Sequence, residues 1–276
     1  MHILVTSAAG ANGNGYGGLL AFDSEGRLLG LFSEDTRIAD PRGLAIDDST
    51  GLLFLNSGTN RILALDGNGN VVRDTGPIDG LNPGGGTFGP DRRYYAGSRN
   101  ARTILAFASS LKTAGENVLA PGIVPFPRGF GFGHDGRLFL ASGIGPNGEG
   151  DDTIIAAGPG GDMLSPRFVQ DPELSPLDLV IAPNGNILVS SERPFGASDA
   201  ITTVREYDPS DGQLIRVFSP SDRAEFRRPR GLRFAPDGNL YCVAEHEVVG
   251  FDFSSGACLG AVVRFPRLNG QAVACF

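Results

Sequence analysis

The chain has 276 residues, of which 41% are hydrophobic, and this is enough to build a packed core. Its net charge of −8 repels polyanions and argues against nucleic acid as a general partner. Glycine (41 residues) and proline (19 residues) recur at regular intervals instead of gathering in a linker, which indicates many short strands and turns. We therefore expect a single domain over residues 1–276, because all-β propellers and barrels of this length form one domain.

Short apolar segments predict strands from the first residues onward. The segments HILVTS, GGLLAFD and RLLGLF, at 2–7, 17–23 and 27–32, are the first three. A complete unit of four strands follows from Asp40, in the segments GLAID, LLFLN, RILALD and VVRDTG. Apolar residues alternate or run continuously within each segment, as half-buried and fully buried strands require. The polar stretches DSTG and GNGN between them are turn sequences.

The same unit recurs along the chain. Its copies open at Pro41, Pro83, Pro127, Pro176 and Pro229, which are 42, 44, 49 and 53 positions apart. The copy at Pro83 is weak, whereas the last three each have a turn glycine nine positions after the proline, at Gly136, Gly185 and Gly238. A period of this length is typical of four-stranded propeller blades.

The two ends of the chain supply one further blade. The last segment, PRLNGQAVACF, predicts an opening strand with nothing after it, while the first three strands lack an opening strand. Pairing them completes the blade and leaves no open sheet edge. We therefore predict an all-β fold, a six-bladed β-propeller of four-stranded antiparallel blades. Its ring is closed by pairing the C-terminal strand with the N-terminal three strands.

The repeat resembles the NHL repeat, which has a PxG opening, an apolar strand ending in Asp, a turn glycine, a second apolar strand and an Asn-Arg pair. The matching residues are Pro41, Gly43, Asp47, Gly51, Asn60 and Arg61. The resemblance covers essentially the whole chain and implies a six-bladed propeller, similar in its repeats to streptogramin lyase-like and gluconolactonase-like propellers. It implies little about function, because propellers of this family include enzymes, receptor domains and protein- or RNA-binding modules.

The blade order sorts the loops onto two faces. The opening of each first strand and the loop between strands two and three lie on one face, and the other turns lie on the opposite face. The opposite face has tight turns, where we expect His134 and nearby His2 to be structural or solvent-facing. The first face has three long loops, at 8–17, 143–152 and 192–200. Long loops on one face of a rigid scaffold usually carry recognition, so we expect a ligand site there.

Arginine recurs at the middle of the PxG openings. In ring order these positions hold Arg42, Gly84, Arg128, Leu177, Arg230 and Asn269. We expect the three arginines to form a ring at the channel mouth that binds an anionic substrate, since guanidinium suits bidentate contact with carboxylate or phosphate. Asn269 and Tyr16, which lies in the first long loop, are further substrate-binding candidates. The alternative is that the arginines turn sideways and pair with acids such as Asp40 or Glu225.

His246 lies on the loop-rich face between Glu245 and Glu247. A histidine beside a carboxylate suits general acid–base catalysis, so His246, Glu245 and Glu192 are the catalytic candidates. Other residues of the long loops that are placed to assist are Asp151, Asp152 and Asp199. The alternative is an ordinary polar loop.

The resemblance to the lyases and lactonases implies a divalent metal. The gluconolactonase-like enzymes hold it with Glu, Asn and Asp at the channel mouth, and the streptogramin lyases use a histidine pair and a glutamate around magnesium. Here the mouth positions hold arginine, glycine, leucine and one asparagine, and three arginines disfavour a cation. The loop-rich face also lacks a second histidine. We therefore expect no metal and no other cofactor.

The remaining signals exclude several classes of protein. Cys242, Cys258 and Cys275 form no CxxC, so we expect buried free thiols and no zinc site or disulfide. The first ten residues lack a basic n-region and a long apolar run, so we expect a cytoplasmic protein with no membrane partner. An arginine cluster comprises Arg223, Arg227, Arg228, Arg230 and Arg233. We expect it to be a solvated face paired with acids, with no bound RNA.

These observations favour a monomeric propeller that binds a small anionic metabolite at the channel mouth. Metal-independent lyase, isomerase or hydrolase chemistry, with His246 moving a proton, would extend this function. One alternative is a metal-dependent enzyme similar to the streptogramin lyases or lactonases. The other is a non-catalytic module that docks a protein partner on the loop-rich face.

Overall fold

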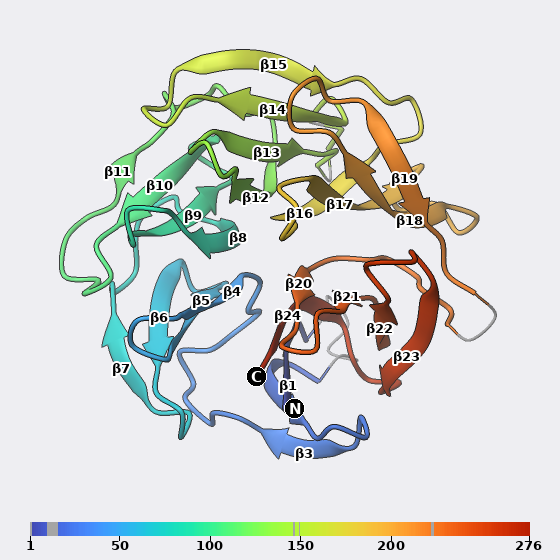
Figure 1. Ribbon diagram of the computed structural model, residues 1–276. Helices are drawn as coiled ribbons and strands as arrows, with labels where there is room; N and C mark the ends of the chain where they lie inside the picture. The colour runs from blue at the N-terminus through green and yellow to red at the C-terminus, as the bar shows by residue number, and fades with distance from the viewer. Residues whose placement is uncertain (1, 10–15, 146, 149, 222–223) are drawn as a thin grey trace.

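The computed structural model describes residues 2–9, 16–145, 147–148, 150–221 and 224–276. It confirms the predicted ring of six blades, each a sheet of four antiparallel strands (Figure 1). Within the described ranges every element is a strand, and no helix there is long and apolar enough to cross a membrane.

The strands follow the predicted order. The first blade contains β24 (Gly270–Cys275), β1 (Ile3–Ser7), β2 (Gly18–Phe22) and β3 (Leu28–Leu31). The second contains β4 (Leu44–Asp47), β5 (Leu52–Ser57), β6 (Arg61–Leu65) and β7 (Val71–Asp74). The third contains β8 (Pro83–Phe88), β9 (Tyr94–Ser98), β10 (Thr103–Phe107) and the short β11 (Glu116–Asn117).

The last three blades have longer outer strands. The fourth contains β12 (Pro127–Phe132), β13 (Leu138–Ser142), β14 (Thr153–Ala157) and β15 (Met163–Val169). The fifth contains β16 (Pro176–Ile181), β17 (Ile187–Arg193), β18 (Ile201–Tyr207) and β19 (Leu214–Phe218). The sixth contains β20 (Leu232–Phe234), β21 (Leu240–Val243), β22 (Glu247–Phe251) and β23 (Cys258–Arg264).

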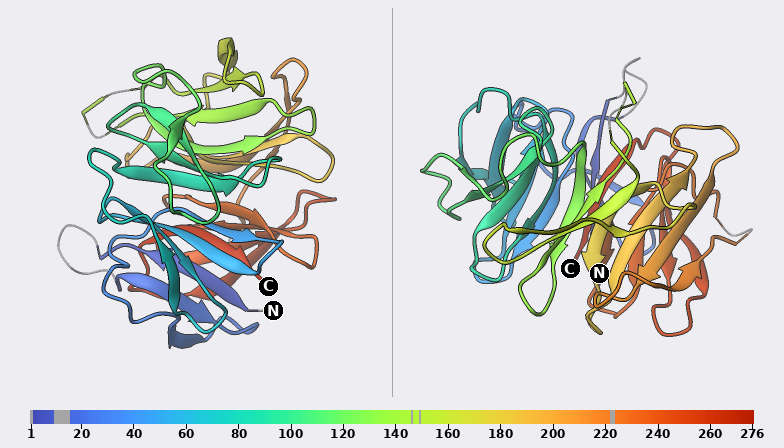
Figure 2. Two further views of the ribbon diagram at one scale, coloured as in Figure 1. Left: turned by 90° about the vertical axis from the view of Figure 1, so that its left-hand side faces the viewer. Right: turned by 90° about the horizontal axis from the view of Figure 1, so that it is seen from above.

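Pairing of β24 with β1 closes the ring, as predicted. The two strands run antiparallel, with Val5 opposite Val273. The residues beyond them continue the ladder, since the backbone N–H groups of His2 and Phe276 each donate to the other's carbonyl, at 2.7 and 3.1 Å. Figure 2 shows the two chain ends together on one face of the ring. Ring closure therefore satisfies the edge that a six-bladed ring would otherwise leave open.

The residues of the NHL-like pattern hold the turns of the second blade. Asp47 ends β4, and its carboxylate accepts hydrogen bonds from Ser49 N at 3.0 Å and Thr50 Oγ1 at 2.7 Å. Asn60 adopts φ 61° just before β6, and its side-chain oxygen accepts from Asn82 N at 2.9 Å. These residues shape the backbone, so the pattern reports on architecture and carries no ligand chemistry of its own.

The core consists of apolar clusters that lie between neighbouring blades. One cluster joins Leu4 and Leu19 of the first blade to Leu55 and Leu63 of the second. Cys242 and Cys275 are buried free thiols, as predicted. The expectation was wrong for Cys258, which is only partly buried because it opens the outer strand β23.

The innermost strands approach one another too closely for side chains. At Gly129 in β12, an added Cβ would lie 2.6 Å from the Asp178 Cα in β16 of the next blade. Glycine is therefore required where these strands meet, and the channel along the ring axis is narrow.

Arg233 fills this channel. It projects from β20 and donates to Asp178 Oδ2 at 3.1 Å, and also to the carbonyls of Leu44 at 3.1 Å and Gly86 at 3.2 Å. Asp178 is buried and accepts a further hydrogen bond from Leu232 N at 2.9 Å. Burial raises the pKa of Asp178, and the Arg233 charge opposes this. The expectation of a solvated arginine face was therefore wrong for Arg233, because its strand points it inward across the axis.

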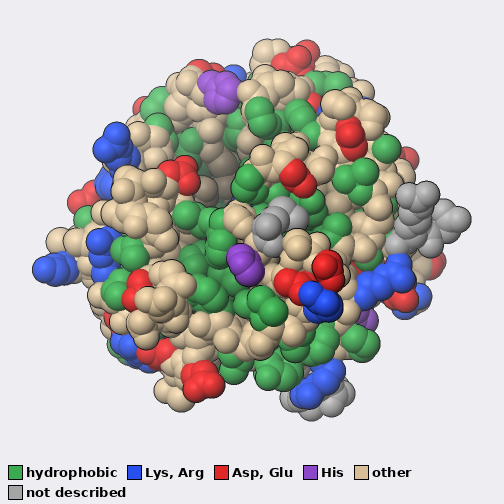
Figure 3. Space-filling model, turned by 60° about the horizontal axis from the view of Figure 1, so that its bottom comes forward, with side chains coloured by type: hydrophobic (Ala, Val, Ile, Leu, Met, Phe, Trp, Pro, Cys, Tyr) green, Lys and Arg blue, Asp and Glu red, His purple; other side chains and the backbone are tan. Residues whose placement is uncertain are grey.

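Arg233 also divides the channel into two cavities. A cavity of about 50 Å³ lies toward the long loops, and one of about 490 Å³ lies toward the tight turns, with Arg233 in the wall of both. The larger cavity is lined by Phe88, Phe132 and His134, so His134 lies on the face predicted for it. Figure 3 brings this face into view and shows a hollow with hydrophobic side chains along its rim.

Replacing Arg233 tests its role as the link between inner strands. Arg233→Met leaves Asp178 buried without a counter-charge, so we expect it to lower the free energy of unfolding by about 3–5 kcal/mol. Adding Asp178→Asn removes the unpaired charge and should recover most of this loss. Chemical denaturation measures both variants. Arg27→Ala, which breaks an exposed ion pair with Asp23, is the control and should leave the midpoint almost unchanged. An Arg233→Met midpoint equal to this control would contradict the role.

Candidate functional site

The arginines of the PxG openings line one cavity on the loop-rich face. Arg42 lies just before β4, Arg128 within β12 and Arg230 just before β20, and all three are in the wall of the cavity of about 50 Å³. The inner strands position them, because these three PxG openings bring their middle residues to the mouth of the channel. The structure thus brings together the three arginines proposed from the repeat register.

A fourth arginine, Arg99, lies in the same wall and was missed from the sequence. It follows β9, in the loop between the second and third strands of the third blade. The opening residue of that blade is Gly84, and an added Cβ there would lie 3.6 Å from Arg99 Nε. Arg99 therefore occupies the space that a side chain at position 84 would compete for. The sequence signal that could have predicted Arg99 is a glycine in the PxG opening of a blade together with an arginine just after the second strand of that blade.

The four guanidinium groups have few acceptors. Arg42 Nη1 donates to Asn82 Oδ1 at 2.7 Å and to the Pro83 carbonyl at 3.1 Å. Arg230 Nη1 pairs with Glu192 Oε2 at 3.2 Å, and Glu192 is only 2% exposed. Within the described ranges Glu192 is the one carboxylate that forms an ion pair with these arginines. The alternative of sideways pairing with an acid between blades therefore holds for Arg230, whose partner is Glu192 and not Asp40 or Glu225.

Two buried N–H groups of this cluster have no acceptor. Arg128 is 9% exposed and donates through Nη2 to the Ile144 carbonyl. Its Nε, like that of Arg99, is buried and has no hydrogen-bond partner among the described residues. A buried donor without an acceptor costs free energy, so a hydrogen-bond acceptor in the cavity would stabilise both groups.

Aromatic rings flank the guanidinium groups. Phe126 lies 4.7 Å from the Arg128 guanidinium carbon and 5.3 Å from that of Arg99. Phe195, from the loop 192–200, lies 4.8 Å from that of Arg128 and 5.8 Å from that of Arg230. Cation–π contact partly offsets the burial of these charges and holds the planar groups in position.

The surroundings of these four arginines disfavour their charged forms. Burial is the main cause that lowers the pKa of Arg128, to about 9, and the neighbouring charge of Arg230 lowers it further. The pKa of Arg99 lies well below its usual value, first through burial and then through the charges of the other three arginines. Burial also lowers the pKa values of Arg42 and Arg230. A negative charge in the cavity would relieve all four.

Two of the long loops contribute to this mouth. The loop 192–200 supplies Phe195, and Glu192 at the end of β17 leads into it. In the loop 143–152, Asp152 accepts from Ser175 Oγ at 2.8 Å and pairs with Arg193 at 2.7 Å. The charge of Asp152 acts on the pKa of Arg128. Residues 10–15 of the first long loop lie outside the described residues.

Tyr16 and Asn269 lie apart from the arginines. Tyr16 contacts the guanidinium of Arg267, which lies 5.3 Å from its ring centroid, and the edge of Phe265, at 5.9 Å between centroids. The Asn269 carbonyl accepts from Gln271 Nε2 at 3.2 Å, and it is Gln271 that lines the cavity. Both residues support the first blade where it meets the sixth.

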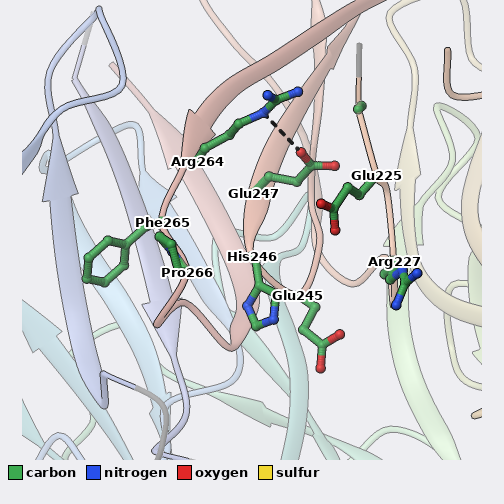
Figure 4. A pocket seen from close by; sticks show the side chains of 9 residues that line it. Glu225, Arg227, Glu245, His246, Glu247, Arg264, Phe265 and Pro266 are labelled. Atoms are coloured by element: carbon green, nitrogen blue, oxygen red, sulfur yellow. Dashed lines mark ion pairs between the residues drawn. The ribbon is translucent and has the colours of Figure 1, made fainter. Parts of the chain in front are cut away.

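His246 and Glu245 line a different pocket, of about 400 Å³, on the sixth blade (Figure 4). His246 Nδ1 lies 2.7 Å from the Leu268 carbonyl. A carbonyl only accepts, so Nδ1 carries the proton in the neutral ring and Nε2 is the free acceptor. Glu245 pairs with Arg228 at 2.7 Å. The structure therefore separates these two catalytic candidates from the arginine cavity, whereas Glu192 forms an ion pair with Arg230 of that cavity.

Two further carboxylates lie in the pocket of His246. Buried Glu247 accepts a hydrogen bond from Phe226 N and lies 3.7 Å from Arg264 Nε, the pair marked in Figure 4. Glu225 also lines this pocket. Figure 4 shows the Phe265 ring turned away from these carboxylates. Of the predicted arginine cluster, Arg227 lines this same pocket and Arg223 lies outside the described residues.

The residues at the channel mouth do not fit a divalent cation. Arginines line this mouth and would repel a divalent cation, which prefers oxygen ligands. In the part of the chain that the structure describes, no group of three or more His, Cys, Asp or Glu side chains is arranged to hold a metal ion. The site is chemically suited to an anion.

Comparison with solved structures supports the fold. The chain matches a streptogramin B lyase with a TM-score of 0.65 at 15% sequence identity, over 88% of this chain and 76% of that one. It matches a gluconolactonase from Xanthomonas campestris with a TM-score of 0.64 at 16% identity, over 99% and 87% of the two chains. A chain of a nidogen/laminin complex matches with a TM-score of 0.73 at 13% identity, over 99% and 97%. No protein-family model and no curated protein matches the sequence.

Removing one of the crowded charges should stabilise the empty protein. We expect Arg99→Met to raise the free energy of unfolding by about 0.5–2 kcal/mol in low-salt buffer without multivalent anions, because it removes a buried cation that other cations repel. Arg61→Met is the matched control. Arg61 pairs with Asp74 at 2.8 Å, so its loss should lower stability. Thermal and chemical denaturation measure both variants, and a destabilised Arg99→Met would mean that the chain itself satisfies Arg99.

Proposed function

We propose that this protein binds a small anionic molecule at the loop-rich mouth of its channel, through Arg42, Arg99, Arg128 and Arg230. The observation that carries the proposal is the pair of buried Nε–H groups, on Arg99 and Arg128, that have no acceptor among the described residues and lie in a cavity lined by these four arginines and Arg233. An anion would accept these hydrogen bonds and offset the repulsion among the guanidinium groups.

The proposal follows from the difference between the empty and the bound site. Without a ligand the cavity bears the cost of burying mutually repelling charges, which the lowered pKa values of Arg99 and Arg128 reflect. With an anion bound, each guanidinium gains a charge-assisted hydrogen bond. These bonds are about twice as strong as neutral ones.

Acid–base catalysis by His246 stays a prediction. The charges of Glu245 and Arg228 both act on the pKa of Arg230, so the pocket of His246 lies within electrostatic range of the arginines. A ligand long enough to reach from the arginine mouth to His246 Nε2 would bring the two together. Lyase, isomerase or hydrolase chemistry would need such a ligand.

A thermal-shift series tests the proposed binding. Anions such as phosphate, sulfate and citrate should raise the melting temperature at constant ionic strength, since a ligand at 100 times its Kd adds about 2.7 kcal/mol of stability. We expect Arg42→Ala, Arg128→Ala and Arg230→Ala each to weaken binding by tenfold or more. This corresponds to the loss of a charged hydrogen bond, about 1.5–3 kcal/mol.

Arg137→Ala is the control for that series. Arg137 is also partly buried and paired, with Asp135 at 2.6 Å, but it lies in a turn of the opposite face. Its response to anions should equal that of the unmodified protein. A response to divalent metals in place of anions, or one that survives all three mouth substitutions, would overturn the proposal.

A further inference from the structure

We propose that the group bound by the four arginines is a doubly charged tetrahedral oxyanion, as in a phosphate monoester or sulfate, and not a carboxylate. This inference rests on the proposed function and names the class of ligand for that same cavity. Three features of the mouth carry it: the directions of the donors, the local charge and the size of the cavity.

The donors reach the cavity from around the ring. Arg42, Arg99, Arg128 and Arg230 belong to the second, third, fourth and sixth blades, which surround the axis in Figure 1. A carboxylate has two oxygens whose lone pairs lie in one plane, so it can face one or two guanidinium forks. The terminal oxygens of a tetrahedral anion point in different directions, so one such group can accept from donors on several sides.

The charge of the cavity also favours a dianion. Glu192 is the carboxylate paired with these arginines in the described part of the chain, so the four cations exceed the acid that contacts them. Below the mouth, Arg233 is matched by Asp178 and adds little to this excess. A carboxylate carries one negative charge and would leave most of the repulsion among the four arginines in place. A dianion would offset twice as much of that repulsion.

The cavity is large enough for a charged group and too small for a whole metabolite. Its volume is about 50 Å³, while pockets that bury drug-sized molecules measure about 300–1,000 Å³. Arg233 closes its inner end. The oxyanion therefore enters first, and any organic remainder of the ligand stays outside, among the long loops near Phe195.

Titration calorimetry on the unmodified protein at constant ionic strength tests the class of ligand. The probes are sulfate, inorganic phosphate, methyl phosphate and acetate. At pH 7.5 we expect each dianion to bind at least about tenfold more tightly than acetate. Methyl phosphate binding as tightly as inorganic phosphate identifies an ester as the natural form. Binding of inorganic phosphate alone identifies the free ion, and either result supports the dianion.

Lowering the pH provides a second, independent arm. A phosphate monoester has a second pKa of about 6, so at pH 5 only about a tenth of it is doubly charged, whereas sulfate keeps both charges. The ratio of the methyl phosphate affinity to the sulfate affinity should fall about tenfold between pH 7.5 and pH 5. Among the described residues, the acids that act on the cluster are Glu192, Asp152, Asp40 and Glu245, and Asp178 lines the cavity beside Arg233. Protonation of these acids would change the affinities for methyl phosphate and sulfate alike, so it would not change the ratio of the two affinities.

The outcomes separate the inference from the function on which it rests. Acetate that binds as tightly as sulfate, or an affinity ratio that does not change with pH, overturns the dianion while anion binding stands. If none of the four anions binds, both proposals fail. Arg99→Met should lose more affinity for sulfate than for acetate, because a carboxylate needs fewer of the donors. An equal loss would count against the tetrahedral geometry.

Discussion

One guanidinium group at the ring axis is the contact around which the inner strands are arranged. Arg233 reaches from the sixth blade to Asp178 of the fifth and to backbone carbonyls of the second and third. The inner strands converge so closely that glycine is required at Gly129, and little space remains for other side chains. Because this one residue links strands that are far apart in sequence and blocks the axis, the propeller has two separate mouths and no open pore.

Arginine thus has two opposite roles within a short distance. Arg233 has acceptors from four blades and is matched by a buried carboxylate, so its charge is compensated by the fold. The arginines above it share one ion-paired carboxylate, Glu192, and two of their buried N–H groups have no acceptor in the described chain. The uncompensated arginines at the mouth therefore lower the stability of the fold, whereas the compensated Arg233 beneath them raises it. This is the arrangement expected where a fold keeps a site ready for an external charge.

The sequence was sufficient for the ring and for part of the mouth. Blade number, strand order and closure follow from the repeat period and from the complementary half-blades at the two ends, because both depend on local patterns. Arg42, Arg128 and Arg230 were found because the register of the repeat fixes the height of each opening residue along the axis.

The features that the sequence did not predict depend on the space between blades, which a repeat pattern does not encode. Arg99 enters only because Gly84 leaves room for it, and Arg233 was misread because the direction of one side chain on β20 decides whether it is solvated or central. His246 shares a face with the arginines but not a cavity, since its pocket lies beside Arg264 and Phe265 at the end of the outer strand β23, whereas Arg230 precedes the innermost strand β20.

Closure by the two ends of the chain has a consequence for synthesis on the ribosome. Strand β1 can pair with β2 as soon as both have emerged, yet its inner edge waits for β24, a partner 266 residues away between Thr6 and Ala272. At about 5–20 residues per second, that edge stays unpaired for tens of seconds. The first blade therefore keeps an unpaired strand edge, open to pairing with other molecules, until β24 has been made.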